Sequence, residues 1–253
     1  MTKEMLDRLC QAADRDAVIL EVHIFLNWVI VNSKSYAMST LLNGMPGLVE
    51  PHGMDTYMGH LIGRNALEIA GEFLNSRETL KRAVGMACLK SILPAPAHYA
   101  EGNAIDRNHE FAREHKTCFI GHFAEAENWR LQGFPVDIIE LFPRPGDIHW
   151  DDSHEVLSNA ELVLITGLTL VNDTFEEVVR RTPRARYRVI MGPTVPVSPV
   201  LFDFGLHQVG GTVIDDYAAI LRYCCRGGGS IAHAPVGALR KINLLKDTEN
   251  DQI

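Results

Sequence analysis

Apolar residues are arranged differently in the two parts of the chain, and the arrangement changes near residue 117. Before that position, short β-branched runs that predict antiparallel strands lie among amphipathic segments that predict helices. The helices are expected at residues 2–13, 61–74 and 77–92, and the strands at residues 18–26, 28–31 and 36–39. Ser76 is placed to cap the third helix, and Pro94 prevents that helix from continuing.

After residue 117, apolar strands alternate with short helices, which is the pattern of βαβ units in a mainly parallel sheet. The strands are expected at residues 117–120, 136–141, 162–166, 187–191 and 207–214. Gly133 is placed to close the helix after the first strand, and Thr174 to open another through a capping box. Asp215 or Asp216 starts the last helix.

The length of the chain agrees with two domains, because 253 residues lie near the size at which a single core tends to divide. We expect a small α+β domain over residues 1–94 and a connecting segment over residues 95–116. A mainly parallel α/β domain is expected over residues 117–253. The fold class is therefore α/β, with an α+β domain in front of the parallel sheet.

Composition excludes several classes of partner. The net charge of −8 repels phosphate backbones, so nucleic acid is not expected as a partner. No stretch approaches the roughly 20 apolar residues that span a bilayer, and residues 1–15 lack the apolar core of a signal peptide. The five scattered cysteines fit neither a disulfide framework nor a C-x-x-C zinc site. We expect a cytoplasmic protein with reduced thiols and no membrane contact.

Small and hydrogen-bonding residues follow four of the predicted parallel strands. Because the carboxyl ends of such strands meet at one edge of the sheet, where ligands bind, these residues are the candidate ligand-binding set. The set consists of Gly121, His122, Phe123, Glu140, Thr166, Gly167, Thr169, Asn172, Thr174, Gly192, Pro193 and Thr194. We expect the Thr194 hydroxyl to face the same crevice as the others. The simplest role of Thr174 is that of a helix cap.

The first strand-to-helix turn lies where a nucleotide-binding fold places its phosphate loop, and Glu140 ends the next strand, where an acidic group would accept bonds from a ribose. The turn at Gly121 lacks two of the three glycines of G-x-G-x-x-G, however. His122 is a candidate metal ligand or proton acceptor. No G-x-S-x-G, H-E-x-x-H or Walker motif is present, so the common hydrolase mechanisms have no support.

Ordered motifs in the second half resemble the putative heavy-metal chelation domain, and the first half is similar to its companion N-terminal domain. The matching residues are 120–123, Glu140, 145–147, Leu157, Ala160, 165–167, 169–172, Thr174, 192–194, Pro196, Pro199 and 210–211, with 27–29, 61–67 and 83–87 in the first half. The resemblance implies an enolase-N-terminal-like domain joined to an atypical Rossmann-like domain, with a site between them. Residues 35–38 and Asp173 depart from the family pattern, in which glycine often stands at position 173.

The resemblance and the candidate set together favour a protein that binds a metal, or a small organic chelator of one, in an interdomain cleft. The cofactor would be a transition-metal ion or a metal chelate, with His122 and Glu140 as its ligands. The competing hypothesis is a Rossmann-like enzyme that uses a nucleotide-like or adenosyl cofactor on a small molecule. A scaffold that binds a partner protein is a third. The sequence leaves open the metal, the substrate, whether the chain is catalytic, and whether it forms a homo-oligomer.

Overall fold

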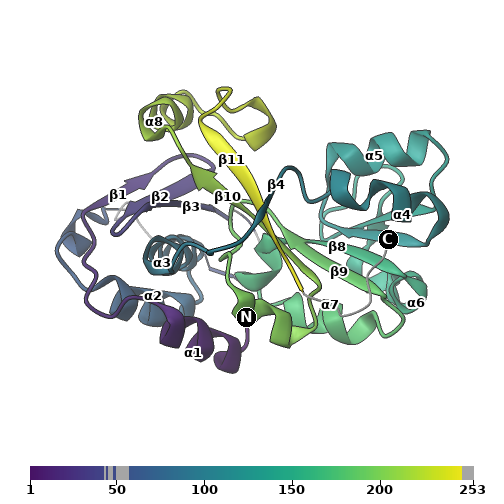
Figure 1. Cartoon of the computed structure of the whole chain (residues 1–253), viewed down its shortest axis with the longest axis horizontal. Coiled ribbons are helices and arrows are strands. Elements are labelled where there is room, and N and C mark those ends of the chain that lie inside the picture. The colour runs from purple at the N-terminus through teal and green to yellow at the C-terminus, as the bar shows by residue number, and fades with distance from the viewer. Residues whose placement is uncertain (43, 45–47, 50–56, 247–253) are drawn as a thin grey trace.

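The computed structural model describes residues 1–42, 44, 48–49 and 57–246, whose strands form two sheets (Figure 1). The smaller sheet is antiparallel, in the order β1-β2-β3, and lies in the N-terminal part of the chain. Its strands are β1 (Glu21–Ile24), β2 (Trp28–Asn32) and β3 (Tyr36–Thr40). The predicted hairpin is therefore present, although the first strand, Glu21–Ile24, is shorter than its apolar run.

Three helices pack beside this small sheet. They are α1 (Lys3–Ala12), α2 (Ala66–Leu74) and α3 (Thr79–Ile92). Helix α2 begins later than predicted because the Asn65 side chain accepts hydrogen bonds from the backbone amides of Leu67 and Glu68 and so sets its start. The predicted cap of α3 is wrong, since the Ser76 hydroxyl accepts a bond from Glu78 N before the helix begins and makes no capping bond to it.

The larger sheet runs in the order β4-β11-β10-β9-β8-β5-β6-β7. Its strands are β4 (Ala100–Glu101), β5 (Thr117–Ile120), β6 (Val136–Glu140), β7 (Ile148–His149), β8 (Leu162–Thr166), β9 (Tyr187–Met191), β10 (Gln208–Ile214) and β11 (Leu239–Leu245). Within this order, the strands β10, β9, β8, β5, β6 and β7 pair in parallel with their neighbours. Strand β11 pairs antiparallel with β10 and with β4 at the other end of the sheet. The five predicted strands thus lie side by side, which confirms the mainly parallel sheet.

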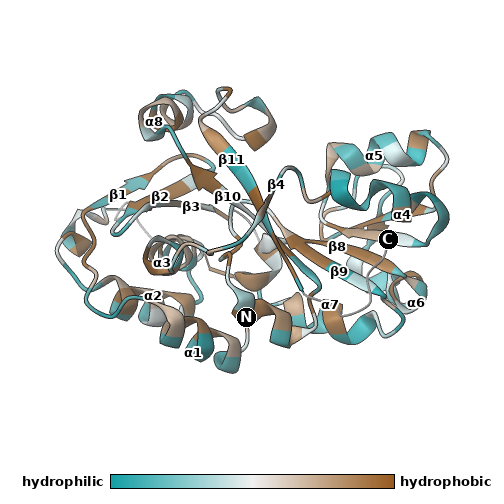
Figure 2. Ribbon diagram, in the orientation of Figure 1, coloured by the Kyte–Doolittle hydropathy of each residue, from teal (hydrophilic) through white to brown (hydrophobic). Residues whose placement is uncertain are grey.

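Helices cover both faces of this sheet. Successive residues of a strand point to opposite faces, so each strand contributes side chains to both helix layers. Phe119 packs on one face with Trp129, in the layer of α4 (His109–Glu114) and α5 (Ala124–Leu131). Ile120 packs on the other face, in the layer of α6 (His154–Asn159) and α7 (Phe175–Arg181). Figure 2 shows the apolar colouring of β8 and β9 between these layers. Within the described ranges, no helix is long and apolar enough to cross a membrane.

The chain leaves the large sheet between β10 and β11 to form α8 (Tyr217–Cys225) and the 3₁₀ helix η6 (Ile231–His233). Asp216 caps α8 through Ala219 N, as predicted. This insertion packs on the small sheet, where Ile220 and Cys224 share a core with Trp28 and its neighbours. The indole of Trp28 also donates a hydrogen bond to Gly228 O at 2.7 Å. Residues from the C-terminal part therefore complete the core of the N-terminal part.

A polar cluster joins the same insertion to strand β1. Glu21 accepts hydrogen bonds from the Tyr36 hydroxyl at 2.8 Å, the Asn32 amide at 3.2 Å and the Tyr217 hydroxyl at 3.3 Å. It also lies 2.9 Å from His23 Nε2. The rings of Tyr36 and Tyr217 stack with centroids 3.7 Å apart. The hydrogen bond with His23, followed by that from Tyr36, lowers the pKa of Glu21 to about 2.

Because the folded pKa of Glu21 lies below its ordinary value, its ionised form stabilises the native state above about pH 4.5, and this contribution is lost as the pH falls toward 2. The side chain is 38% exposed, so we expect no more than about 1 kcal/mol. Urea unfolding of the wild type and of Glu21→Gln should differ at pH 7 and coincide near pH 2. Glu68→Gln, on the exposed face of α2, is the control, and a gap that does not change with pH would contradict the prediction.

A buried amide network attaches the segment before β5 to the sheet. Asn108 Nδ2 donates to Gln208 Oε1 at 2.9 Å, and Gln208 Nε2 donates to Asn243 Oδ1 at 2.8 Å. Asn243 Nδ2 then donates to Gly102 O at 2.8 Å. All three amides are at most 8% exposed. Because buried amides need partners, this network fixes residues 102–108 across β10 and β11.

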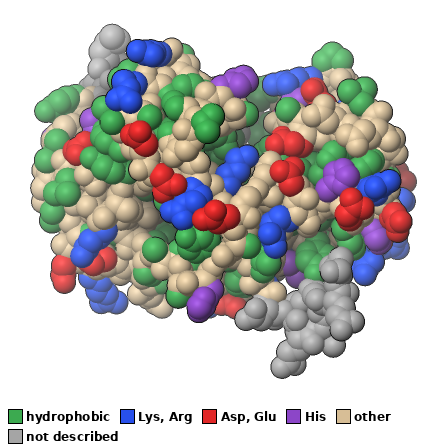
Figure 3. All heavy atoms as spheres, turned by 45° about the horizontal axis from the view of Figure 1, so that its top comes forward, with side chains coloured by type: hydrophobic (Ala, Val, Ile, Leu, Met, Phe, Trp, Pro, Cys, Tyr) green, Lys and Arg blue, Asp and Glu red, His purple; other side chains and the backbone are tan. Residues whose placement is uncertain are grey.

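The surface of the molecule carries both signs of charge. On the face drawn in Figure 3, acidic and basic side chains are interspersed. On this face, Lys and Arg side chains do not gather into an extended basic patch of the kind that binds nucleic acid.

Candidate functional site

The order of the parallel strands reverses at β5, which defines a crevice. Strand β5 pairs with β6 on one side and with β8 on the other. The chain therefore passes from β5 to β6 and later returns to the opposite side of β5. In open α/β sheets, the carboxyl ends of the strands at such a reversal border a crevice where ligands bind.

Gly121 occupies the tightest point of this crevice. Its φ of +103° is a conformation that side-chain-bearing residues rarely adopt, and a Cβ atom there would lie 3.1 Å from the Cβ of Thr166. The loops after β5 and β8 therefore approach each other closely only because position 121 is glycine. This confirms the turn that the sequence predicted after the first parallel strand.

A cavity of about 320 Å³, here called the Asn172 hollow, opens at this point. Eight of the predicted residues line it together: Gly121, His122, Phe123, Glu140, Thr166, Thr169, Asn172 and Thr174. Leu141, Phe142, Trp150 and Leu168 complete much of its wall. Groups that are distant in the sequence thus share one hollow, as the strand-end pattern indicated.

Glu140 holds the first strand-to-helix turn in place. One carboxylate oxygen accepts a hydrogen bond from His122 N at 2.7 Å, and the other accepts one from Leu141 N at 3.1 Å. Each oxygen keeps a second lone pair for a ligand in the hollow. The carboxylate therefore serves first as an anchor for the backbone at position 122.

The imidazole of His122 lies between two other carboxylates. Its Nδ1 is 3.0 Å from Asp147 Oδ2, and its Nε2 is 2.8 Å from Glu127 Oε1. The second contact is close but poorly aligned, so Nε2 makes no hydrogen bond within the described part of the chain. Asp147 is 1% exposed and also accepts a bond from Arg144 N, which fixes it in position. This arrangement orients the ring through Nδ1.

The loop after β8 supplies the opposite wall of the Asn172 hollow. The 3₁₀ helix η4 (Gly167–Leu170) begins it, and the Thr169 hydroxyl donates to Thr166 O at 2.8 Å. The predicted capping box is wrong: Thr174 stands at the N-cap position of α7, but its hydroxyl donates to Asn172 Oδ1 at 2.7 Å. With Oδ1 occupied, the amide nitrogen of Asn172 has no protein partner among the described residues and is available as a donor.

Asp173 ties this loop to the N-terminal part of the chain. Its φ of +64° is one that glycine adopts readily, which accounts for the glycine expected at this position in the family pattern. Its carboxylate accepts hydrogen bonds from Arg82 at 2.6 Å and from the Met1 ammonium. Burial raises the pKa of Asp173, but these two bonds outweigh burial and the pKa is lowered overall.

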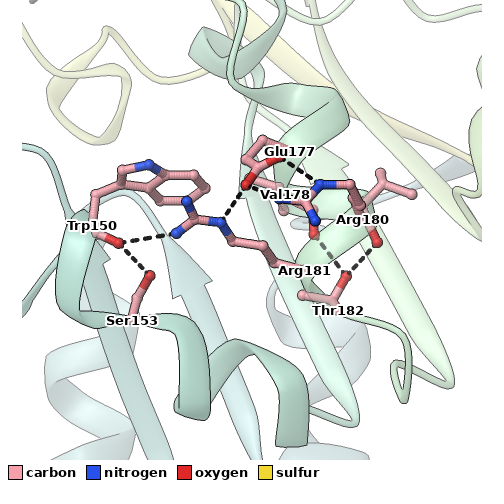
Figure 4. Close-up of polar contacts among 8 residues, drawn as sticks. Trp150, Ser153, Glu177, Val178, Arg180, Arg181 and Thr182 are labelled. Carbon is pink, nitrogen blue, oxygen red and sulfur yellow. Dashed lines mark hydrogen bonds and ion pairs between the residues drawn. The ribbon is translucent and has the colours of Figure 1, made fainter.

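Aromatic side chains border the outer side of the same hollow. Phe142 is 61% exposed there. Trp150 is held by Arg181, whose guanidinium lies 4.5 Å from the ring centroid and donates a bond to Trp150 O at 3.3 Å (Figure 4). Ser153 Oγ donates to the same carbonyl at 2.6 Å. Helix α7 thus fixes the position of one aromatic wall.

The remaining predicted residues line a second, adjoining cavity of about 300 Å³, the Thr194 hollow. They are Gly167, Gly192, Pro193 and Thr194, while His122, Phe123 and Thr166 line both hollows. Residues of the N-terminal part, Trp28 and Thr40, also contribute to it. Thr194 thus lines this second hollow together with His122 and Thr166 and does not line the Asn172 hollow. Its hydroxyl accepts a hydrogen bond from Thr40 N at 3.1 Å and donates one to Thr40 Oγ1 at 3.0 Å.

The donor set does not suit a bare metal ion. Among residues 1–42, 44, 48–49 and 57–246, no group of three His, Cys, Asp or Glu side chains is placed to hold one. Protein sites for transition metals normally supply three or four donors. The predicted pair is insufficient by itself, since both oxygens of Glu140 face backbone amides and both ring nitrogens of His122 face other carboxylates. These residues fit a metal only if it brings further ligands.

The candidate set from the sequence omits residues that the structure places at the same hollow, among them Asp147, Phe142 and Trp150. A signal existed for the first, because Pro145-Gly146-Asp147 is a turn sequence just after the Glu140 strand and Gly146 has a φ of +93°. Phe142 lies in the loop after β6 and Trp150 begins a 3₁₀ helix, Trp150–Asp152, and the sequence gives no comparable signal for either residue.

Two family models match most of the chain. The model of a family described as putative heavy-metal chelation matches residues 103–243, and a second model with the same description matches residues 6–93. The chain belongs to this putative heavy-metal chelation family, DUF364, with its companion N-terminal domain. The resemblance noted in the sequence is confirmed, while the domain boundaries at residues 94 and 117 stay predictions.

Individual relatives extend over nearly the whole chain. An uncharacterized protein of Methanocaldococcus jannaschii is 26% identical over 236 residues, covering 87% of this chain and 88% of the relative. A DUF364 protein of unknown function from Desulfitobacterium hafniense has a crystal structure with a TM-score of 0.82 at 20% identity, covering 96% of this chain and 98% of that one. Another from Pyrococcus horikoshii gives a TM-score of 0.75 at 15% identity, with the same coverage. These structures show the shared fold.

Proposed function

We propose that this protein binds a heavy-metal chelate, a metal ion already held by a small organic molecule, with the organic part in the Asn172 hollow. One observation carries the proposal. Eight predicted residues converge on a cavity at the strand reversal, yet the described residues offer no cage of three metal donors. A ligand that brings its own donors satisfies both facts, and it agrees with the description of the family.

The side chains around the hollow have distinct roles in this proposal. The hydrogen bond between Asp147 and Nδ1 of His122 is the support that metal-ligating histidines commonly have, and it leaves Nε2 to complete the coordination of a metal. Glu127 stands beside Nε2 on a side chain that is 53% exposed, so it can turn into solvent when a ligand arrives. The Asn172 amide donates to the organic part.

The proposal predicts that the protein binds metal complexes and does not bind the free ion stoichiometrically. Isothermal titration would compare Ni²⁺ alone with Ni²⁺ already complexed to equimolar planar heteroaromatic or aminocarboxylate chelators. His122→Ala should weaken binding of the complex by about 10-fold or more, the range seen when a metal's coordination or its support is lost. Glu140→Gln should also weaken it, because an amide replaces one oxygen that accepts a backbone N–H.

The matched control for His122 is His154→Ala, which removes an exposed histidine at the start of α6. Binding by this variant should equal that of the wild type. Tight stoichiometric binding of Ni²⁺ alone, unaffected by either site substitution, would exclude the proposal.

A second candidate function is favoured by the strand order. Numbered along the chain from β5, the parallel strands follow the order 3-2-1-4-5-6 of dinucleotide-binding sheets, and Glu140 stands at the end of the second strand, where such proteins bind a ribose. A nucleoside or adenosyl compound would then occupy the Asn172 hollow. A thermal shift with a panel of these compounds tests it, because a ligand at 100 times its Kd raises stability by about 2.7 kcal/mol. No shift at millimolar ligand would count against this candidate.

A further inference from the structure

A third cavity, of about 700 Å³, lies apart from the Asn172 hollow and is here called the Lys90 cavity. Its wall takes residues from α1, β3, α3, the segment after α3, β10 and β11. The polar and aromatic side chains that line it include Asp14, Lys34, Tyr36, Lys90, Tyr99 and Arg240. It is large enough for a small organic molecule, and neither function discussed above uses it.

Two of the three cations on this wall already have carboxylate partners. Lys34 Nζ lies 2.9 Å from Asp14 Oδ2, and this hydrogen bond raises the pKa of Lys34. Arg240 makes two bonds of 3.0 Å to Asp215 and also contacts Glu101. The carboxylates at or beside the cavity are therefore committed to other cations.

Lys90 has a different environment. Its Nζ donates hydrogen bonds to the backbone oxygens of Met38, at 2.6 Å, and Pro193, and the described residues place no carboxylate against it. The amine is enclosed by protein, and this loss of water lowers the pKa of Lys90 to about 7. A large fraction of Lys90 is therefore neutral near neutral pH.

A neutral amine can make both of these hydrogen bonds. An uncharged –NH₂ group has two N–H donors and one lone pair, and here both donors find carbonyl partners. The lone pair then occupies the remaining tetrahedral direction. Lysines whose ammonium form is disfavoured in this way act as nucleophiles toward carbonyl groups. The tyrosine rings of Tyr36 and Tyr99, with Pro94 and Pro96, give the cavity apolar surface for a carbon skeleton.

We propose that Lys90 is a carbonyl-reactive amine, which forms an imine with a small aldehyde or ketone bound in the Lys90 cavity. The Nζ lone pair forms a bond to the carbonyl carbon, and the C=O π electron pair moves to the oxygen, which then takes one of the two protons from the nitrogen to give a carbinolamine. Loss of that hydroxyl with the nitrogen's hydrogen releases water and leaves a C=N bond. The Lys90 cavity and the Asn172 hollow share no lining residue. A test of this proposal therefore does not test the proposed chelate site, and the reverse is also true.

Reductive trapping of the intact protein tests the proposal. The protein is incubated near pH 7 with sodium cyanoborohydride and either propanal, a neutral probe, or glyoxylate, an anionic one. The reductant converts any imine into a stable secondary amine, which peptide mass mapping locates among the seven lysines, Lys3, Lys34, Lys81, Lys90, Lys116, Lys241 and Lys246. With at least one probe, we expect Lys90 to be modified about 10 times faster than Lys34, which shares the cavity but is paired with Asp14.

The comparison with Lys34 is internal to one folded sample, so it does not depend on whether a variant folds. Modification of Lys90 no faster than Lys34 with both probes would overturn the proposal and leave Lys90 as a structural contact between β3 and the loop after β9. Lys90→Arg keeps a donor for the two carbonyls but cannot form an imine. Fast labelling should disappear in this variant, and fast labelling that moves unchanged to another lysine would also overturn the proposal.

Discussion

Replacing Gly121 by alanine is expected to destabilise the protein by about 2–6 kcal/mol and to abolish ligand binding at the Asn172 hollow. Two costs add. The φ of +103° is strained for any residue with a side chain, at about 1–3 kcal/mol. The new Cβ would lie 3.1 Å from the Cβ and Cγ2 of Thr166 and 3.3 Å from the Phe123 ring, which adds about 1–3 kcal/mol of overpacking. Chemical denaturation measures the loss of stability.

Gly133→Ala separates the two costs. Gly133 also has a positive φ, of +85°, but a Cβ there would meet nothing within 4 Å. This control should lose only about 1–2 kcal/mol, the cost of the left-handed conformation, and should bind ligand as the wild type does. Equal losses in the two variants would show that the close approach of the loops after β5 and β8 costs nothing, contrary to the geometry of the crevice.

Gln208→Leu should produce a loss of similar size through a different mechanism. It removes the central member of the buried amide network and leaves Asn108 Nδ2 with an unpaired hydrogen and Asn243 Oδ1 without its donor. Each buried group without a partner costs about 1–3 kcal/mol, so the expected loss in the free energy of unfolding is about 2–6 kcal/mol. The change in urea midpoint at constant slope provides the measurement.

The matched control is Gln132→Leu, an exposed glutamine at the end of α5. It makes the same chemical change without leaving buried polar groups and should stay within about 0.5 kcal/mol of the wild type. A Gln208→Leu variant as stable as this control would mean that the network contributes little beyond the packing of an apolar side chain of the same size.

The parallel core of the fold was predictable because its longer strands are mostly apolar and lie between turn residues. Strand β8 is an example, with Leu162 to Ile165 all buried. Strand β11 was missed because Arg240 and Lys241 interrupt its apolar residues and because its antiparallel partner β10 is separated from it by the α8 insertion. Strands β4 and β7 have two residues each, too few to give a pattern.

The two wrong caps have a common cause. Ser76 and Thr174 both stand near helix starts, where hydroxyl residues are favoured. Each hydroxyl instead makes a local bond outside the helix, to Glu78 N in one case and to Asn172 Oδ1 in the other. Such local bonds compete with capping, and sequence alone does not decide which of them is made.

The location of the candidate site could be predicted from a general property of parallel sheets, since residues at the carboxyl ends of neighbouring strands lie at the same edge of the sheet. The division of this region into the Asn172 hollow and the Thr194 hollow could not be predicted in the same way. The separation of Thr194 from Asn172 depends on the contact between Thr194 and Thr40 of the small sheet, which joins residues far apart in the chain. Trp150 likewise takes its place from its stacking with Arg181. The pattern of apolar and polar residues within one segment does not predict such contacts between distant segments.

The insertion between β10 and β11 has a consequence for biosynthesis. Trp28, in the second strand of the chain, depends for its cover on Ile220 and Cys224 and for its indole hydrogen bond on Gly228. Domains commonly fold in order as they emerge from the ribosome, but here one apolar face of the first sheet lacks its cover until the insertion that carries Ile220, Cys224 and Gly228 has been synthesised. Native contacts of such long range slow folding and prolong the exposure of apolar surface that leads to aggregation.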